Sequence, residues 1–385
     1  MIPYGKQNIS NEDIEAVKDV LSSDFLTQGP VVPKFEDSVR KYVDCNFAYA
    51  TNSATSALHI ACLSIGLTKG DILWTSPNSF VASSNCALYC GAKVDFVDIC
   101  LDTYNICINS LEEKLVTAKK ENRLPKILIP VHLSGNPCDM KKIKSLSDEY
   151  GFKIIEDASH AIGAKYDDLP VGNCKYSDIC VFSFHPVKII TTGEGGMAVT
   201  NNEDLAKKLE LYRSHGITRN RDMMESDLGP WYYEQLLLGF NYRMTDIQAA
   251  LGCSQLKRID NFIIRRHAIA SNYNDLLKDL PIVLPQENLN SYSSLHLYII
   301  RLKLNEINKT HKEVFLAIKK REIGINLHYI PIHMHPYYQS LGFKKGDFPN
   351  SEKYASESIS IPIFPQLSEK LQNDVVKAIK DSLEE

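Results

Sequence analysis

The sequence has little of what marks a secreted, membrane or nucleic-acid-binding protein. Its net charge of −4 over 385 residues gives no electrostatic case for a nucleic acid, which needs a clustered basic face. No apolar run approaches the roughly 20 residues that span a bilayer. Residues 1–20 lack the apolar core and the cleavage site of a signal peptide. We therefore expect a cytoplasmic protein that binds neither membranes nor nucleic acids.

Two common motifs are also missing. The ten cysteines are scattered and none forms a C-x-x-C pair, so we expect reduced thiols and neither a disulfide framework nor a metal site. No G-x-G-x-x-G follows an apolar run, which argues against a nicotinamide-dependent dehydrogenase of the Rossmann type.

What is present favours an α/β protein. Apolar residues make up 44% of the chain and charged residues 23%, as is usual for a globular protein. Buried-strand patterns alternate with helical ones, which predicts a mainly parallel central sheet with helices on both faces. The predicted strands lie within 93–99, 126–133, 152–159, 178–184 and 195–200.

The pattern changes near residue 245. Thr245 and Gln248 have the spacing of a capping box, so a long helix is expected to start there and to run on towards residue 280. A chain of this length exceeds the roughly 250–300 residues of a single core. We predict a large α/β domain over residues 1–256 and a smaller α+β domain over residues 257–385.

Reactive side chains follow two of the predicted strands, where ligands gather in α/β proteins. Asp157 ends the apolar run before Ala158, and such an acid often only caps the next helix. Lys188 stands between two apolar strands, in a loop that also holds Gly193, Gly195 and Gly196. A lysine in an enclosed loop loses its charge readily and can form a Schiff base, whereas a buried carboxylate can keep a pyridine nitrogen protonated.

Two further features fit a flat, phosphorylated ligand. Residues 52–57 (NSATSA) begin an apolar-periodic helix, and the free N–H groups of such a helix start can hold a phosphate. Taken alone, this segment is an ordinary helix cap. Phe80 is typical of core packing, but it follows an apolar run and could also stack on a ring.

Together these segments resemble the DegT/StrS-type family of sugar-nucleotide aminotransferases, within the fold type I enzymes that use pyridoxal 5'-phosphate (PLP). The resemblance covers nearly the whole chain. Its segments are 22–30 (SSDFLTQGP), 52–58 (NSATSAL), 156–163 (EDASHAIG), 183–196 (SFHPVKIITTGEGG), 212–216 (YRSHG) and 239–252 (GFNYRMTDIQAALG).

The resemblance implies a role for each of these residues. Lys188 would carry the cofactor and move protons, Asp157 would pair with the pyridine nitrogen, and His160 would lie by the ring. Asn241 would reach the phosphate from a neighbouring subunit, which implies a homodimer with shared active sites. The remaining cofactor contacts would come from Ser183, Phe80 and the backbone at Ala54 and Thr55.

A finer resemblance is to the branch that installs the 4-amino group in pseudaminic acid biosynthesis. There the substrates would be L-glutamate and a UDP-linked 4-keto-6-deoxy sugar. The segment 231–243 (WYYEQLLLGFNYR) departs from that branch by being longer and more aromatic, which leaves the sugar open. The implied substrate contacts are Tyr4, Asp24, Phe25, Leu26, Thr27, Asn326, Leu327, His328 and Tyr329.

Several alternatives stay open at this level. Dehydratases on the same scaffold typically carry histidine in place of the Schiff-base lysine, so Lys188 argues against that activity. Amination at C-3, or of another UDP- or dTDP-linked keto sugar, is not excluded. A catalytically silent regulator is disfavoured because Lys188, Asp157 and Asn241 are all present.

Overall fold

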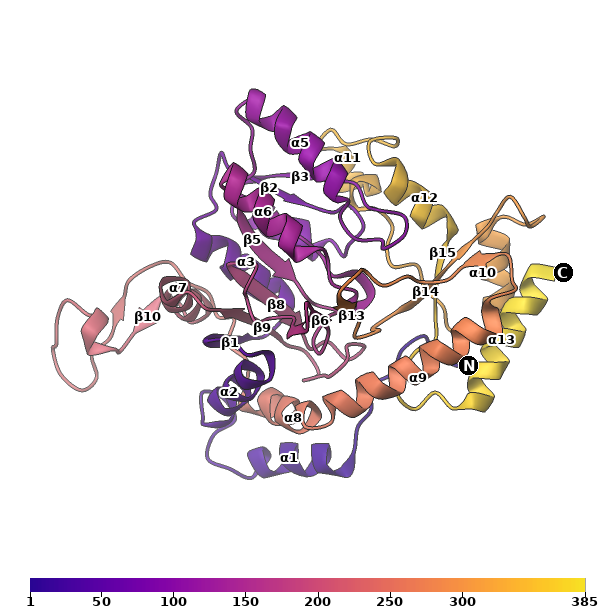
Figure 1. The fold of residues 1–385 in the computed structure, drawn as a ribbon. Helices are drawn as coiled ribbons and strands as arrows, with labels where there is room; N and C mark the ends of the chain where they lie inside the picture. Colours follow the sequence, from indigo (N-terminus) through magenta and orange to yellow (C-terminus); the bar gives the residue numbers. More distant parts are fainter. Residues whose placement is uncertain (385) are drawn as a thin grey trace.

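The computed structural model describes residues 1–384, and a seven-stranded sheet lies at its centre (Figure 1). All strands run parallel except β9, which is antiparallel to both of its neighbours. The strand order is β1-β9-β8-β5-β4-β2-β3. Their bounds are β1 Phe47–Thr51, β2 Ile72–Thr75, β3 Lys93–Phe96, β4 Ile127–Ile129, β5 Lys153–Asp157, β8 Ile179–Ser183 and β9 Gly196–Thr200.

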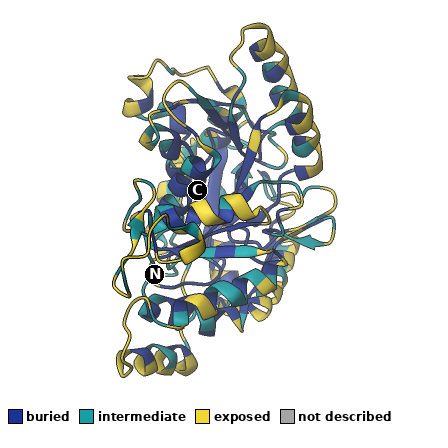
Figure 2. Ribbon diagram, turned by 90° about the vertical axis from the view of Figure 1, so that its left-hand side faces the viewer, coloured by how far each residue is buried: buried dark blue, intermediate teal, exposed yellow. Residues whose placement is uncertain are grey.

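Helices cover both faces of this sheet, as predicted, because its strands are apolar on both faces. Every residue of β4, β8 and β9 is buried, which is typical of strands packed on two sides. Figure 2 shows this buried interior beneath more exposed outer helices. One face packs on α3 (Ala54–Ile65), α4 (Ala82–Tyr89) and α7 (Glu203–Arg213); the other packs on α2 (Val31–Val43), α5 (Ile108–Lys120), α6 (Met140–Tyr150) and α8 (Asp246–Leu256).

The predicted long helix is in fact two helices, so that expectation was wrong. Thr245 caps α8 with the predicted capping box to Gln248, but α8 ends at Leu256 and α9 (Ile259–Leu277) begins three residues later. The side chain of Arg258, at the break, donates to the Asn8 carbonyl at 3.1 Å and pairs with the buried Asp13. The N-terminal segment thus binds the helix break, a contact that no local pattern shows.

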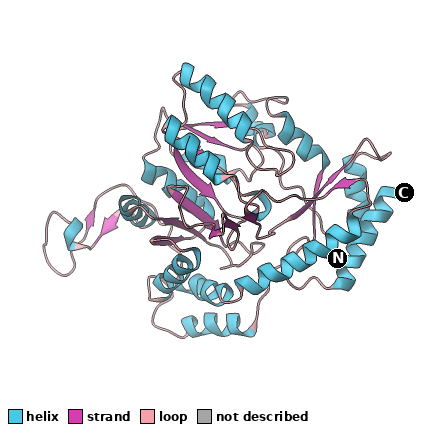
Figure 3. Cartoon of the chain, viewed as in Figure 1, coloured by secondary structure: helices cyan, strands magenta, loops and turns pink. Residues whose placement is uncertain are grey.

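The C-terminal part builds its own small sheet and core. Strands β12 (Ile282–Val283), β14 (Tyr298–Leu302) and β15 (Ser358–Ile361) are antiparallel and pack on helices (Figure 3). The boundary near residue 256 stays a prediction. The helices around this sheet are α9, α10 (His311–Lys320) and α13 (Glu369–Glu384), and α11 (Pro336–Gln339) and α12 (Pro349–Glu357) connect back towards β3.

A two-stranded hairpin projects from the body, at the left of Figure 1. It consists of β10 (Ile217–Thr218) and β11 (Glu234–Gln235), with exposed apolar side chains around it. Within residues 1–384, no helix is long and apolar enough to cross a membrane. The other elements are α1 (Asn11–Leu21), β6 (Lys165–Tyr166), β7 (Leu169–Pro170) and β13 (Ser291–Tyr292), with short 3-10 turns at Leu133–Gly135, Arg221–Met223 and Ile332–Met334.

Candidate active site

A cavity of about 870 Å³ opens beyond the carboxyl ends of β5 and β8. This is the edge of a parallel sheet where ligands are expected, and the volume lies within the range of small-molecule sites. The first turn of α3, the loop before α4, the β8–β9 loop and two segments of the C-terminal and N-terminal parts complete the walls. The predicted residues that line the cavity are Tyr4, Ala54, Thr55, Phe80, Asp157, His160, Ser183, Lys188, Asn326, His328 and Tyr329.

Lys188 supplies the amine of this site. Its loop leaves β8 and returns to β9, and it is held at the base by Phe184, whose N–H donates to the Gly195 carbonyl at 2.9 Å. The Thr191 hydroxyl donates to the Phe184 carbonyl at 3.0 Å. Burial lowers the pKa of Lys188 to about 8, against the opposing effect of Asp157. About a tenth of this amine is therefore uncharged and nucleophilic at pH 7, far more than for a lysine in water.

Asp157 supplies the acid, and two donors orient it. The hydroxyl of Ser83, on α4, donates to Oδ2 at 2.6 Å, and the Ser159 N–H donates to Oδ1 at 3.1 Å. Asp157 is the last residue of β5 and is only 5% exposed. The carboxylate therefore faces the cavity in a fixed orientation.

The start of α3 forms the anion seat that the sequence suggests. Ser53 is the N-cap, and its side chain accepts the Ser56 N–H at 3.1 Å, while the first N–H groups of the helix have no intrahelical partner. Gly196 lets β9 pass close to the first residues of α3, because a Cβ at this position would lie 2.4 Å from the Ala54 nitrogen. The helix start is thereby fixed against the end of the sheet.

Aromatic and histidine side chains form the opposite wall. The ring centroids of His160 and His296 lie 4.3 Å apart with the ring planes tilted by 44°, and the Nε2 of His160 lies 3.2 Å from the Tyr329 hydroxyl. Burial lowers the pKa values of His160 and His296 well below their usual range, with Lys188 adding to the effect. Both rings are therefore neutral, and each leaves a buried Nδ1 without a partner. Phe80 lies nearby, its ring centroid 6.1 Å from that of Tyr329.

These groups fit PLP. A nucleophilic amine, an oriented carboxylate, a helix N-terminus for the phosphate and a wall of flat side chains meet in one cavity. The unpartnered Nδ1 of the buried His160 is consistent with a ligand that completes the site. Within residues 1–384, no group of acidic, histidine or cysteine side chains is arranged to hold a metal ion.

Some predicted residues lie outside this cavity in the single chain. Leu26 and Thr27 pair with the start of α8, since the Leu26 carbonyl accepts the Asp246 N–H at 3.0 Å and Thr27 bridges to Thr245. Their proposed contacts to the substrate therefore stay predictions. The residues outside the cavity lining are Asp24, Phe25, Leu26, Thr27, Asn241 and Leu327.

Sequence reasoning also missed residues that line the site or support it. His296 lies just before β14, and Gln248 on α8 donates to the Glu194 carbonyl at 2.9 Å across the cavity mouth. Ser83 sits inside a run of small residues (82–86, ASSNC) that reads as ordinary helix packing. Of these three residues, only His296 had a usable signal in the sequence, because it is a polar residue directly before an apolar strand.

Comparison with known proteins identifies the enzyme class. The profile of the DegT/DnrJ/EryC1/StrS aminotransferase family matches residues 7–380. The chain belongs to this family. Its aminotransferases depend on PLP, and the expected family, fold class, enzyme class and cofactor are thereby confirmed.

Individual DegT-family relatives cover the whole chain. A UDP-4-amino-4,6-dideoxy-N-acetyl-beta-L-altrosamine transaminase of Campylobacter jejuni is 37% identical over 384 residues, which is 100% of this chain and 96% of the relative. The solved structure of Helicobacter pylori PseC, an aminotransferase involved in the biosynthesis of pseudoaminic acid, is 31% identical, with a TM-score of 0.90 over 100% of this chain and 99% of that one. The PLP form of a putative sugar aminotransferase, Spr1654 of Streptococcus pneumoniae, is 27% identical, with a TM-score of 0.88 over 100% and 98%.

Proposed function

We propose that this enzyme transfers an amino group from L-glutamate to C-4 of a UDP-linked 4-keto-6-deoxy sugar. The substrate would be UDP-2-acetamido-2,6-dideoxy-hexos-4-ulose, and the product would serve pseudaminic acid or related surface-glycan biosynthesis in the cytoplasm. The observation that carries the proposal is the joint placement of Lys188 and Asp157 in one cavity. The similarity to the Campylobacter transaminase supports the choice of sugar.

The residues divide the chemical work between them. PLP, when bound, supplies an electron-accepting ring and a carbonyl that reacts with amines. Lys188 would hold the cofactor and then move the proton at the reacting carbon, because its lowered pKa lets it act as a base near neutral pH. Asp157 would keep the pyridine nitrogen protonated, and the N–H groups of Ala54 and Thr55 would hold the phosphate with Ser183.

The wall that would face the sugar is uncharged at neutral pH. Burial lowers the pKa of His328 to about 4, with Lys188 adding to the effect, and burial raises the pKa of Tyr4 and of Tyr329. Neutral hydroxyl and imidazole groups pair well with the hydroxyl and carbonyl groups of a sugar, and they do not attract a second anion. Remote contacts to the nucleotide would then orient the keto group towards Lys188.

We also propose that the enzyme is a homodimer whose partner completes the site. Among the described residues that line the cavity, none is an arginine, although the donor and the nucleotide are both anionic. The hairpin exposes Leu228, Trp231 and Leu238 by 66%, 74% and 79%, which is unusual for side chains that stay in water. Asn241, at the base of the hairpin, would then reach the partner's phosphate seat.

The reaction is tested by incubating the enzyme with glutamate and a panel of UDP- and dTDP-linked keto sugars, followed by mass and NMR analysis. We expect amination at C-4 of the UDP-linked sugar and none with Lys188→Ala, which should still bind PLP. Amination of only 3-keto sugars would refute the C-4 assignment. A colourless protein that takes up no added PLP would refute the enzymatic proposal altogether.

The shared site is tested by complementation between two inactive variants. Lys188→Ala removes the amine, and Asn241→Asp would place a negative charge against the partner's phosphate. A mixed dimer of the two variants should regain one complete site, so mixing them under exchange conditions should restore part of the activity. If each variant acts only within its own subunit, the mixture stays inactive and the shared site is ruled out.

A further inference from the structure

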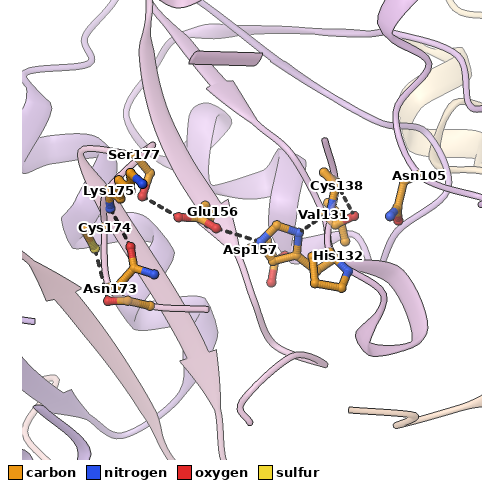
Figure 4. A network of polar contacts seen from close by, with 12 residues as sticks. Asn105, Val131, His132, Cys138, Glu156, Asp157, Asn173, Cys174, Lys175 and Ser177 are labelled. Atoms are coloured by element: carbon orange, nitrogen blue, oxygen red, sulfur yellow. Dashed lines mark hydrogen bonds and ion pairs between the residues drawn. The ribbon is translucent and has the colours of Figure 1, made fainter. Parts of the chain in front are cut away.

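Next to Asp157 lies a second buried acid that faces away from the cavity. Glu156 and Asp157 are consecutive residues of β5, so their side chains point to opposite faces of the sheet. Both carboxyl groups are buried, each residue being only 5% exposed. Figure 4 shows Glu156 between Ser177 on one side and His132 on the other, with Asp157 next to it.

Each oxygen of Glu156 has its own donor. Oε2 lies 2.8 Å from the Nε2 of His132, a ring with no exposed surface, and Oε1 accepts the hydroxyl of Ser177. The Nδ1 of His132 accepts the Cys138 N–H at 3.0 Å. The ring is thus held at both nitrogens, and Glu156 joins the segment after β4 to the segment before β8.

The direction of these hydrogen bonds is fixed by the backbone. The Cys138 N–H already points at Nδ1, where a second ring proton would sit. Because Nδ1 accepts that N–H, the single proton of the neutral ring lies on Nε2, which donates it to Glu156.

The same segment holds the backbone of Asp157. The His132 N–H donates to the Asp157 carbonyl at 3.1 Å, and the Asp157 N–H donates to the Pro130 carbonyl at 2.9 Å. Val131, between them, bridges to Asp157 and lines the cavity. A shift of His132 would therefore act directly on the Asp157 carbonyl, and a shift of the whole 130–132 segment would act on the peptide units on both sides of Asp157.

We infer that Glu156 and His132 are positioning residues that fix Asp157 for its contact with the cofactor's ring nitrogen. This inference rests on the proposed function of Asp157. A buried carboxylate–imidazole pair adds little stability compared with an apolar pair of the same volume, because both groups lose their hydration. What the pair does provide is orientation: two directional hydrogen bonds set the strand end from which Asp157 projects.

The test is Glu156→Gln in the full-length, PLP-loaded enzyme. Glutamine keeps the shape, but it gives the His132 proton a neutral acceptor in place of a charged one, and its amide nitrogen reverses the hydrogen bond to Ser177, whose hydroxyl must turn to accept it. We expect kcat to fall about 10-fold or more, with the KM for the keto sugar unchanged. The pH midpoint of the absorbance change of the lysine-bound cofactor should also shift, by about half a unit or more, because the ring nitrogen senses Asp157.

Two partner variants separate positioning from packing. His132→Leu removes the donor and should shift the midpoint in the same direction, whereas His132→Gln keeps an N–H donor and should restore most of kcat. Glu352→Gln is the matched control, since Glu352 accepts from the buried His333 at 3.0 Å in the C-terminal part. Glu352→Gln should lower the thermal stability about as much as Glu156→Gln does, and it should leave the pH midpoint of the cofactor's absorbance change unchanged.

The outcomes are distinguishable from a failure of the proposed function. If Asp157→Asn shifts the midpoint while Glu156→Gln leaves both the midpoint and kcat unchanged, only the positioning role is refuted. An equal shift with Glu352→Gln would also refute it, because the effect would then follow from loss of stability. If neither Asp157→Asn nor Lys188→Ala changes the absorbance of the bound cofactor, the proposed function itself fails.

Discussion

The hydroxyl of Ser83 donates to Oδ2 of Asp157 at 2.6 Å, joining α4 to the end of β5 across 74 residues of sequence. Ser83 in turn lies 2.7 Å from the hydroxyl of Ser79, in the loop that also carries Phe80. The acid and the loop of Phe80, the side chain proposed to cover the ring, are thus linked by two consecutive hydrogen bonds through Ser83. The position of α4 would therefore affect both the proposed contact to the ring nitrogen and the side chain proposed to cover the ring.

Ser83→Ala should weaken PLP binding. A buried carboxylate oxygen loses its donor, which costs about 1–3 kcal/mol, or about a 5- to 150-fold rise in the Kd of PLP. Fluorescence titration of the cofactor-free protein measures this. Ser84→Ala is the control, because the Ser84 hydroxyl is equally buried but contacts Tyr338 and not the site; an equal loss there would contradict the prediction.

Uptake of PLP should depend on pH through the Lys188 amine. Burial holds the pKa of Lys188 at about 8, so its uncharged, reactive form becomes dominant above that pH, about two units earlier than for a lysine in water. The rate at which the yellow absorbance develops should rise with a midpoint near pH 8. Asp157→Asn removes the group that raises this pKa, and the midpoint should move lower; an unchanged midpoint would place the titrating group elsewhere.

Lys188→Met should stabilise the cofactor-free protein at pH 7. The folded pKa is lowered, so the unfolded chain binds more protons between about pH 8 and 10.5, and stability rises with pH across that window. The cost of burying the ammonium is fully present below pH 8 and absent above pH 10.5. Removing the ammonium group should raise the free energy of unfolding at pH 7 by about 1–3 kcal/mol, allowing for partial solvent access. Urea unfolding at pH 7 and at pH 10.5 tests this, and a gain of equal size at both pH values would contradict it.

Gly196→Ala should both destabilise the protein and weaken its binding of the PLP phosphate. The new Cβ would lie 2.4 Å from the Ala54 nitrogen and 2.4 Å from the Ser53 carbonyl carbon, and backbone atoms cannot move aside as a flexible side chain can. We expect a loss of about 2 kcal/mol or more in unfolding free energy, together with a higher Kd for PLP. Gly5→Ala, where no atom lies within 4 Å of the new Cβ, should cost far less.

Trp231→Ser should weaken the proposed dimer. A side chain that is 74% exposed in the single chain contributes nothing to folding there, so its removal should leave the thermal unfolding of the single chain unchanged. If the hairpin packs on a second copy, the dissociation constant of the dimer should rise about 10-fold or more relative to the unchanged protein. Sedimentation velocity over a dilution series measures this. Tyr337→Ser, an exposed aromatic residue away from the hairpin, is the control.

The sequence predicted the strands that carry the site because each of them is a short apolar run with its own turn signals. It also located the α3 start and the capping box at Thr245, which depend on residues only three positions apart. The break between α8 and α9 could not be predicted in this way. Its partner is Asp13, 245 residues away, and periodicity carries no information about such a contact.

By itself, the sequence determined which residues have the chemistry: an amine at Lys188, an acid at Asp157 and a helix start at Ser53. The tertiary structure decided how those groups act. Sheet order brings the ends of β5 and β8 together, and burial there lowers the pKa of Lys188 to about 8. The donors on Asp157 and the His132–Glu156 pair behind it come from other segments. Reactivity depends on desolvation and on the direction of hydrogen bonds, and both arise only when distant segments pack against each other.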